Sequence, residues 1–96
     1  MIHIFYTHRL AEITRRFEES LEVPAPLSVR ELVDRLTARY GKAFAEEIDL
    51  RSTEIGVDSP FYLVFVDGIR IWEKEREEKK IREGSAVSFL SLMSGG

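Results

Sequence analysis

The sequence SVRELVDRLTARYG at residues 28–41 decides the fold, because its helical pattern is the clearest in the chain. Its apolar residues recur at the spacing of one helix face: Val29, Leu32, Val33, Leu36 and Tyr40. Ser28 is placed to accept a hydrogen bond from the backbone three residues on while Glu31 reaches back, which is a capping box. Gly41 is predicted to end the helix in the left-handed αL conformation. One amphipathic helix with a single apolar face therefore needs an apolar surface to cover.

Two strands are predicted before this helix. Residues 2–6 (IHIFY) alternate, with the first, third and fifth residues on one side, as in a strand with a buried face. Residues 13–23 again mix alternating apolar residues with charges, which predicts a second strand that contains a bend or a bulge. Pro24 and Pro26 then separate this strand from the helix.

The segment after the helix has no clear pattern over residues 42–60. Its first part, AFAEEIDL, is compatible with a short helical turn, and RSTEIGVDSP is typical of a loop. The next stretch, residues 61–66 (FYLVFV), is nearly all apolar, as a central strand buried on both faces would be. Asp67 and Gly68 then form a strong hairpin signal, which leads into a strand at residues 69–72.

The last third of the chain ends in one more strand. The charged residues 73–80 are expected to form a solvated loop, with a protein-docking surface as the alternative. Trp72 beside them is expected in the core, with an interface position as the alternative. Glu83 and Gly84 predict a turn before a mainly apolar strand at residues 86–92. Strands grouped around one long helix predict an α+β domain with the helix across one face of a sheet.

The composition and net charge of the chain argue against several classes of function. The chain has 96 residues with 44% hydrophobic content, which suits one domain with one core. A net charge of −3 argues against binding to nucleic-acid backbones, and no residue run is long and apolar enough to cross a bilayer. We expect a cytoplasmic protein. The absence of cysteine excludes disulfides and thiolate chemistry within the chain, so any sulfur must be imported.

Catalytic motifs are lacking in the sequence. His3 and His8 have no metal-ligand spacing, so we expect no metal site. The sequence has no GxSxG motif, and its internal glycines are isolated, so no loop is suited to hold a nucleotide phosphate. We therefore expect that the protein is not an enzyme by itself and binds no cofactor of its own.

The final residues, Met93, Ser94, Gly95 and Gly96, carry the strongest functional signal. Two glycines can enter a narrow channel and adopt any backbone conformation that a partner's active site requires, because they have no Cβ atom. The carboxylate of Gly96 would be unhindered there. The ordering entropy, about 1–2 kcal/mol per residue, would have to be offset by docking of the folded domain. A frayed end is the alternative for this segment.

The ordered set of these segments resembles the ubiquitin-like β-grasp sulfur carriers, in particular the molybdopterin synthase small subunit (MoaD-like) and its thiamin-pathway relative (ThiS-like). The resemblance rests on MIHIFY, SVRELVDRLTARYG, FYLVFVDGIRI, IREGSAVSFL and the terminal GG. It implies a β-grasp domain at residues 1–92, with about five strands on one main helix, and a flexible Gly-Gly tail at residues 93–96. The first and last strands would be parallel neighbours in the centre of a mixed sheet.

The resemblance also implies a chemistry. An E1-like partner (MoeB/ThiF-like) would use ATP to adenylate Gly96, and a sulfur donor protein would convert the adenylate to a thiocarboxylate. The sulfur would then pass to a pterin precursor in the synthase large subunit (MoaE-like). Gly95, Ser94 and Met93 would give access to the terminus. Leu90 and Leu92 would contribute to partner docking.

One departure from the family pattern affects the choice of partner. The MoaD-like ending FFPPxxGG appears here as FLSLMSGG, so Ser91 and Leu92 stand where prolines would stiffen the exit of the tail. A thiamin-pathway carrier and a ubiquitin-like modifier whose Gly96 is joined to protein lysines remain alternatives. A binding module that never has its terminus activated is a further alternative of a different class.

Overall fold

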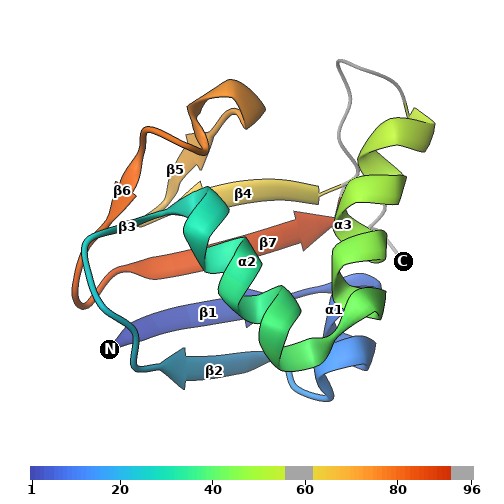
Figure 1. The fold of residues 1–96 in the computed structure, drawn as a ribbon, viewed down its shortest axis with the longest axis horizontal. Coiled ribbons are helices and arrows are strands. Elements are labelled where there is room, and N and C mark those ends of the chain that lie inside the picture. Colours follow the sequence, from blue (N-terminus) through green and yellow to red (C-terminus); the bar gives the residue numbers. More distant parts are fainter. Residues whose placement is uncertain (56–61, 92–96) are drawn as a thin grey trace.

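The middle strand of the main sheet is β7 (Ala86–Ser91). The computed structural model describes residues 1–55 and 62–91, without the side chains of residues 49–55 and 73. The sheet has the strand order β2-β1-β7-β4-β5 (Figure 1). Its other strands are β1 (Ile2–Tyr6), β2 (Glu18–Leu21), β4 (Tyr62–Val66) and β5 (Ile69–Ile71). The pair β1–β7 is parallel, and every other neighbouring pair in this sheet is antiparallel. The prediction of parallel first and last strands in the centre of a mixed sheet is confirmed.

Helices cover one face of this sheet. The helix α2 (Val29–Tyr40) lies across the sheet (Figure 1). The helices α1 (His8–Thr14) and α3 (Lys42–Ile55) lie together at one end of it (Figure 1). At the opposite end, β3 (Leu27–Ser28) pairs with β6 (Lys80–Ile81), and the short helix η1 (Glu73–Glu75) follows β5. This arrangement is the α+β β-grasp fold that the sequence predicted.

The core lies between the helices and the covered face of the sheet. Alternate residues of β1, β4 and β7 point into it, as the period-2 pattern requires. The largest fully buried side chains include Tyr62, Phe44, Phe89, Leu32 and Leu36. Burial of Leu32 and Leu36 confirms that the apolar stripe of α2 faces the sheet.

Two local predictions are confirmed in atomic detail. The Ser28 hydroxyl accepts from the Glu31 N–H at 3.0 Å, and the Ser28 N–H donates to the Glu31 carboxylate at 2.7 Å, which completes the capping box. In the hairpin, Asp67 and Gly68 have φ values of 51° and 84°, as a tight turn between strands demands. The Asp67 carboxylate also accepts from the Ala86 N–H at 2.9 Å, which fixes the start of β7.

The predicted second strand at residues 13–23 is wrong in its first half. Residues 8–14 form α1, whose Leu10 and Thr14 are buried one helical turn apart. Arg15 then adopts φ 61° and ψ 32° and ends the helix, and only Glu18–Leu21 form β2. The alternating pattern failed because α1 has only seven residues, so few apolar positions reveal its period.

The ambiguous segment after α2 is mainly helical. The loop prediction for its second part is wrong for residues 51–55, which belong to α3, and residues 56–60 lie outside the described part. Gly41 has a positive φ of 91°, but its ψ of −172° is not αL. Its N–H closes the last turn of α2 by donating to the Thr37 carbonyl at 2.7 Å, and its own carbonyl accepts from the Phe44 N–H at 3.1 Å. Gly41 therefore joins two helices directly.

Two predictions about burial are also wrong. Trp72 is not in the core, because 52% of it is exposed just beyond the edge strand β5. In β4, only one face is buried, and Leu63 and Phe65 on the other face are half-buried. Both residues are partly exposed because no described element covers the second face of the sheet (Figure 1).

Candidate docking face and the end of the central strand

A continuous row of side chains crosses the open face of the sheet, and we call it the central row. Strand pairing joins its members in the order Glu18, Phe5, Ser88, Phe65 and Arg70. All five alternate with buried residues along their strands, so they share the face that the helices leave open. The row has two aromatic residues around a small central one and opposite charges at its two ends.

Leu90, the next residue of β7 on the open face after Ser88, adds an apolar side chain to that face. Leu90 pairs with Leu63 of β4 on the same open face. Leu90 is 36% exposed, and Phe5 is 37% exposed. Neighbouring exposed apolar side chains are typical of interaction surfaces. The structure thus places Leu90, one of the residues predicted to dock a partner, on an accessible apolar face.

The carboxyl end of β7 is held by hydrogen bonds to the side chain of Thr7, which follows β1. The Thr7 hydroxyl donates to the Phe89 carbonyl at 2.9 Å and accepts from the Ser91 N–H, also at 2.9 Å. On the other side, Ser91 pairs with Tyr62 of β4. The last described residue of the chain is therefore held on both sides.

The remaining predicted site residues follow directly after this point. Leu92, Met93, Ser94, Gly95 and Gly96 lie outside the described residues. Their roles stay predictions. The strand that precedes them in the sequence, β7, is the middle strand of the sheet.

Arg70 and Trp72 form the rim of the open face at its β5 edge. The Arg70 guanidinium lies 3.6 Å from the centre of the Trp72 ring, which is a cation–π contact. Stacking keeps the charge of Arg70 in place while its N–H groups stay available to a partner. Arg70 was not predicted from the sequence to belong to a site, and an interface position for Trp72 was only the alternative to the core.

A second polar group lies on the covered side, under α2. Glu19 of β2 is buried and accepts from the Tyr6 hydroxyl at 2.5 Å and the Tyr40 hydroxyl at 2.6 Å. Arg16 and Arg39 lie 3.4 Å and 3.9 Å from its other oxygen. Burial, followed by the hydrogen bond to Glu19, raises the pKa of Tyr6 and of Tyr40 above the ordinary value of 10.0. These contacts link β1, β2 and α2, so we interpret the group as structural.

The two histidines do not meet. His3 is exposed on the open face, where its Nδ1 lies 2.9 Å from the Ser20 hydroxyl, and His8 begins α1. Within residues 1–55 and 62–91, no group of three or more described side chains is arranged to hold a metal ion. No helix formed by these residues has the length and apolar character needed to span a bilayer.

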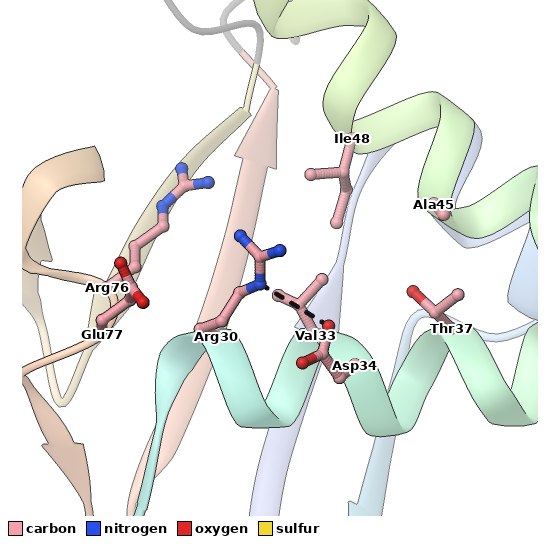
Figure 2. A pocket seen from close by; sticks show the side chains of 8 residues that line it. All are labelled: Arg30, Val33, Asp34, Thr37, Ala45, Ile48, Arg76 and Glu77. Atoms are coloured by element: carbon pink, nitrogen blue, oxygen red, sulfur yellow. Dashed lines mark ion pairs between the residues drawn. The ribbon is translucent and has the colours of Figure 1, made fainter.

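A cavity of about 220 Å³ lies between α2, α3 and the turn after η1 (Figure 2). Its charged lining residues are Arg30, Asp34, Arg76 and Glu77. The two guanidinium groups point toward the same space, and the Arg30 Nε lies 3.6 Å from the Asp34 carboxylate (Figure 2). Two cations and two carboxylates balance, so the charge of the lining favours neither an anion nor a cation.

Sequence comparison identifies the group of proteins with this architecture. The family model described as "ThiS family" matches residues 4–96. The chain belongs to the ThiS family. Among curated proteins, none matches it.

Solved structures with the same fold include three from Pyrococcus furiosus and Haloferax volcanii. The subunit 1 of a putative molybdopterin converting factor from Pyrococcus furiosus has a TM-score of 0.67 at 17% identity, with 94% of each chain covered. The HVO 2177 protein of Haloferax volcanii has a TM-score of 0.72 at 20% identity, covering 99% of this chain and 85% of that one. SAMP1 from Haloferax volcanii gives 0.66 at 16% identity, with 99% and 98% covered. These similarities establish the shared ubiquitin-like β-grasp fold.

Proposed function

We propose that this ThiS-family protein is a sulfur carrier that is activated at Gly96. The observation that carries the proposal is the family match, which extends to residue 96 and so includes Gly95 and Gly96. Two features of the fold support it. The open face offers an apolar docking surface. The central strand, which precedes the Gly-Gly pair in the sequence, is held at its end by two hydrogen bonds of the Thr7 hydroxyl.

The chemistry requires activation because a carboxylate is a poor electrophile. An oxygen of the Gly96 carboxylate attacks the α-phosphorus of ATP, and pyrophosphate leaves, which gives an acyl-adenylate. The terminal sulfur of a donor protein's persulfide then attacks the acyl carbon, and AMP departs with the electron pair of the C–O bond. A thiol then attacks the donor's cysteine sulfur in the resulting acyl disulfide, forms a new disulfide with it, and the thiocarboxylate leaves with the electron pair of the broken S–S bond. ATP and the sulfur donor belong to partner proteins, so the chain is a protein co-substrate and not an enzyme.

The docking face supplies the binding energy for this reaction. Ordering the residues of a tail costs about 1–2 kcal/mol each, and contacts of the folded domain must offset that cost. Leu90, Leu63, Phe5 and Phe65 are the apolar residues of the face that are available for this role. We propose that an E1-like adenylating enzyme covers them during activation, with Leu92 extending the contact.

The sulfur acceptor that we favour is a pterin precursor in molybdopterin synthesis, bound to a MoaE-like large subunit. The Pyrococcus furiosus molybdopterin converting factor subunit supports this choice through its fold. SAMP1 matches the fold equally well, with a TM-score of 0.66 against 0.67, so transfer of the Gly96 acyl group to lysine amines is the second candidate. A thiamin-pathway acceptor is the third, because the matching family model is that of ThiS.

Alkylation of the protein purified from its own host tests the proposal. The chain contains no cysteine, so at neutral pH a thiol-directed reagent such as iodoacetamide has a single anionic sulfur to modify if Gly96 carries a thiocarboxylate. The thioethers of Met1 and Met93 are neutral and react much more slowly. We expect one adduct, located at the C-terminal peptide by mass spectrometry. Alkylation is preferable to the intact mass alone, because replacing oxygen by sulfur and oxidising a methionine both add about 16 Da.

Two variants serve as controls. Deletion of Gly96 should abolish the adduct, and Gly95→Ala should impair activation while changing stability by less than about 0.5 kcal/mol, as surface changes do. Absence of an adduct in the host protein, together with no acyl-adenylate after incubation with the host's adenylating enzyme and ATP, would refute the carrier role. Retained function after deletion of Gly96 would favour the binding module.

A further inference from the structure

The charges at the two ends of the central row have no ion-pair partner among the described side chains. Glu18 lies on the edge strand β2 and Arg70 on the opposite edge strand β5. Neither residue makes a salt bridge with any other residue that the structure describes, although Arg70 stacks on Trp72. The row therefore presents a negative end, an apolar middle and a positive end to whatever covers it.

This pattern is complementary to itself. A two-fold axis that lies along β7 in the plane of the interface exchanges the two edges of a sheet placed face to face with a second copy. Glu18 then lies opposite Arg70 of the second copy, and Phe5 lies opposite Phe65 of the second copy. Ser88, at the centre of the row, meets its own equivalent on the axis. Such isologous contacts are the usual basis of homodimers.

We propose that the open face of the sheet mediates a weak homodimer of this chain, with Glu18 and Arg70 paired across it in both directions. The geometry of face-to-face sheets allows it. Packed sheets lie about 10 Å apart and cross at about −30°, which moves the ends of the row by about 5 Å. The long side chains of glutamate and arginine can span such an offset.

The size of the face explains why the association is weak. Five strands at about 4.8 Å spacing and five residues at about 3.3 Å rise give a footprint of about 400 Å² per copy. Stable interfaces bury about 800 Å² per partner. The dimer should therefore form only at high protein concentration and should dissociate readily when a larger partner competes for the same face.

A charge-exchange experiment tests this arrangement. Sedimentation equilibrium over a concentration range up to about 1 mM measures the dissociation constant of the wild-type dimer. Glu18→Arg places like charges opposite each other at both ends of the interface, and Arg70→Glu does the same. Each single variant should weaken the dimer at least about fivefold, because two ion pairs are replaced by two repulsions. The double variant E18R/R70E should restore it to within about twofold of wild type, since both pairs are re-formed with exchanged signs.

The controls separate this geometry from net charge and misfolding. E12R and R35E make the same charge changes on exposed residues of α1 and α2, and neither should alter the dissociation constant beyond about twofold. Circular dichroism checks that every variant folds. Backbone amide shifts that move with concentration should fall on the outer residues of β1, β4 and β7 and spare α2.

Three results would overturn the proposal. They are a wild-type protein that stays monomeric up to about 1 mM, single charge reversals without effect, and a double variant that fails to recover. None of these results bears on the activation of Gly96, which alkylation measures separately. A dimer that survives the single reversals would use another surface.

Discussion

Replacing Glu19 by glutamine should strongly destabilise the protein, although this side chain lies on a strand at the edge of the sheet. Glu19 accepts hydrogen bonds from Tyr6 at 2.5 Å and Tyr40 at 2.6 Å through one oxygen. Arg16 and Arg39 approach the other oxygen at 3.4 Å and 3.9 Å. Glutamine keeps the shape but removes the charge, and it also turns an NH₂ group toward one of these two sets of donors.

The size of the effect follows from the two tyrosine hydrogen bonds. A bond to a charged acceptor contributes about 1.5–3 kcal/mol and a neutral bond about 0.5–1.5 kcal/mol, so each should lose about 1–1.5 kcal/mol. The ion pairs with Arg16 and Arg39 add little to this loss of stability, because about half of each arginine side chain is exposed. Glu19→Gln should therefore lower the free energy of unfolding by about 2–3 kcal/mol. For a chain of this size, that corresponds to a fall in Tm of about 10–20 °C.

Urea denaturation followed by circular dichroism measures this difference directly. Glu18→Gln is the matched control, because Glu18 is the exposed neighbour on the opposite face, and it should change the free energy of unfolding by less than about 0.5 kcal/mol. Equal effects of the two substitutions, or a loss below about 0.5 kcal/mol for Glu19→Gln, would refute the assignment of Glu19 as the link between β1, β2 and α2.

Three further predictions concern pH, docking and capping. Because the folded protein raises the pKa of Tyr6 and Tyr40 above 10.0, the unfolded chain ionises first, and stability should fall as pH rises above about 10, by up to about 1.4 kcal/mol per pH unit for Tyr6. The double variant Y6F/Y40F should lack this component in urea titrations at pH 9 to 11. Leu90→Asp should lower ATP–pyrophosphate exchange with the adenylating enzyme at least about tenfold, through loss of apolar docking, and an unchanged rate would remove Leu90 from the interface. Ala43→Asp on α3 should leave that rate unchanged. Ser28→Ala should lower stability by about 1 kcal/mol in thermal denaturation, since it removes the cap of α2, and a stability equal to wild type would show that water replaces the cap.

Local rules predicted the parts of the fold whose cause is local. The capping box of α2 depends on two residues three positions apart, and the hairpin depends on the positive φ of Asp67 and Gly68. The order of strands around one long helix gave the α+β class. These features need no knowledge of distant contacts, so a single sequence contains enough information for them.

The errors fall where tertiary contacts decide the structure. In α1, Leu10 and Thr14 are buried under neighbouring elements, but a helix of seven residues shows too little periodicity to be distinguished from a strand. In α3, the helix continues through residues 51–55, whose sequence RSTEI contains two β-branched residues and a serine. Trp72 is exposed because β5 is an edge strand, and the sequence does not reveal the order of strands in the sheet.

The candidate site shows the same division. The Gly-Gly pair and Leu90 could be recognised in the sequence because they adjoin one strand near the end of the chain. The central row could not, because its members at residues 5, 18, 65, 70 and 88 become neighbours only through the pairing register of five strands. A shift of any one strand by a single residue would turn its member toward the core.

That dependence on register connects stability to docking through β7. The inner residues of β7, Val87 and Phe89, are fully buried and fix the register of the strand against β1 and β4. The same register places Ser88 and Leu90 on the open face. Substitutions on the outer positions should therefore alter partner binding without unfolding the domain, whereas substitutions on the inner positions should impair both. The alternation along one strand separates the two roles at adjacent residues.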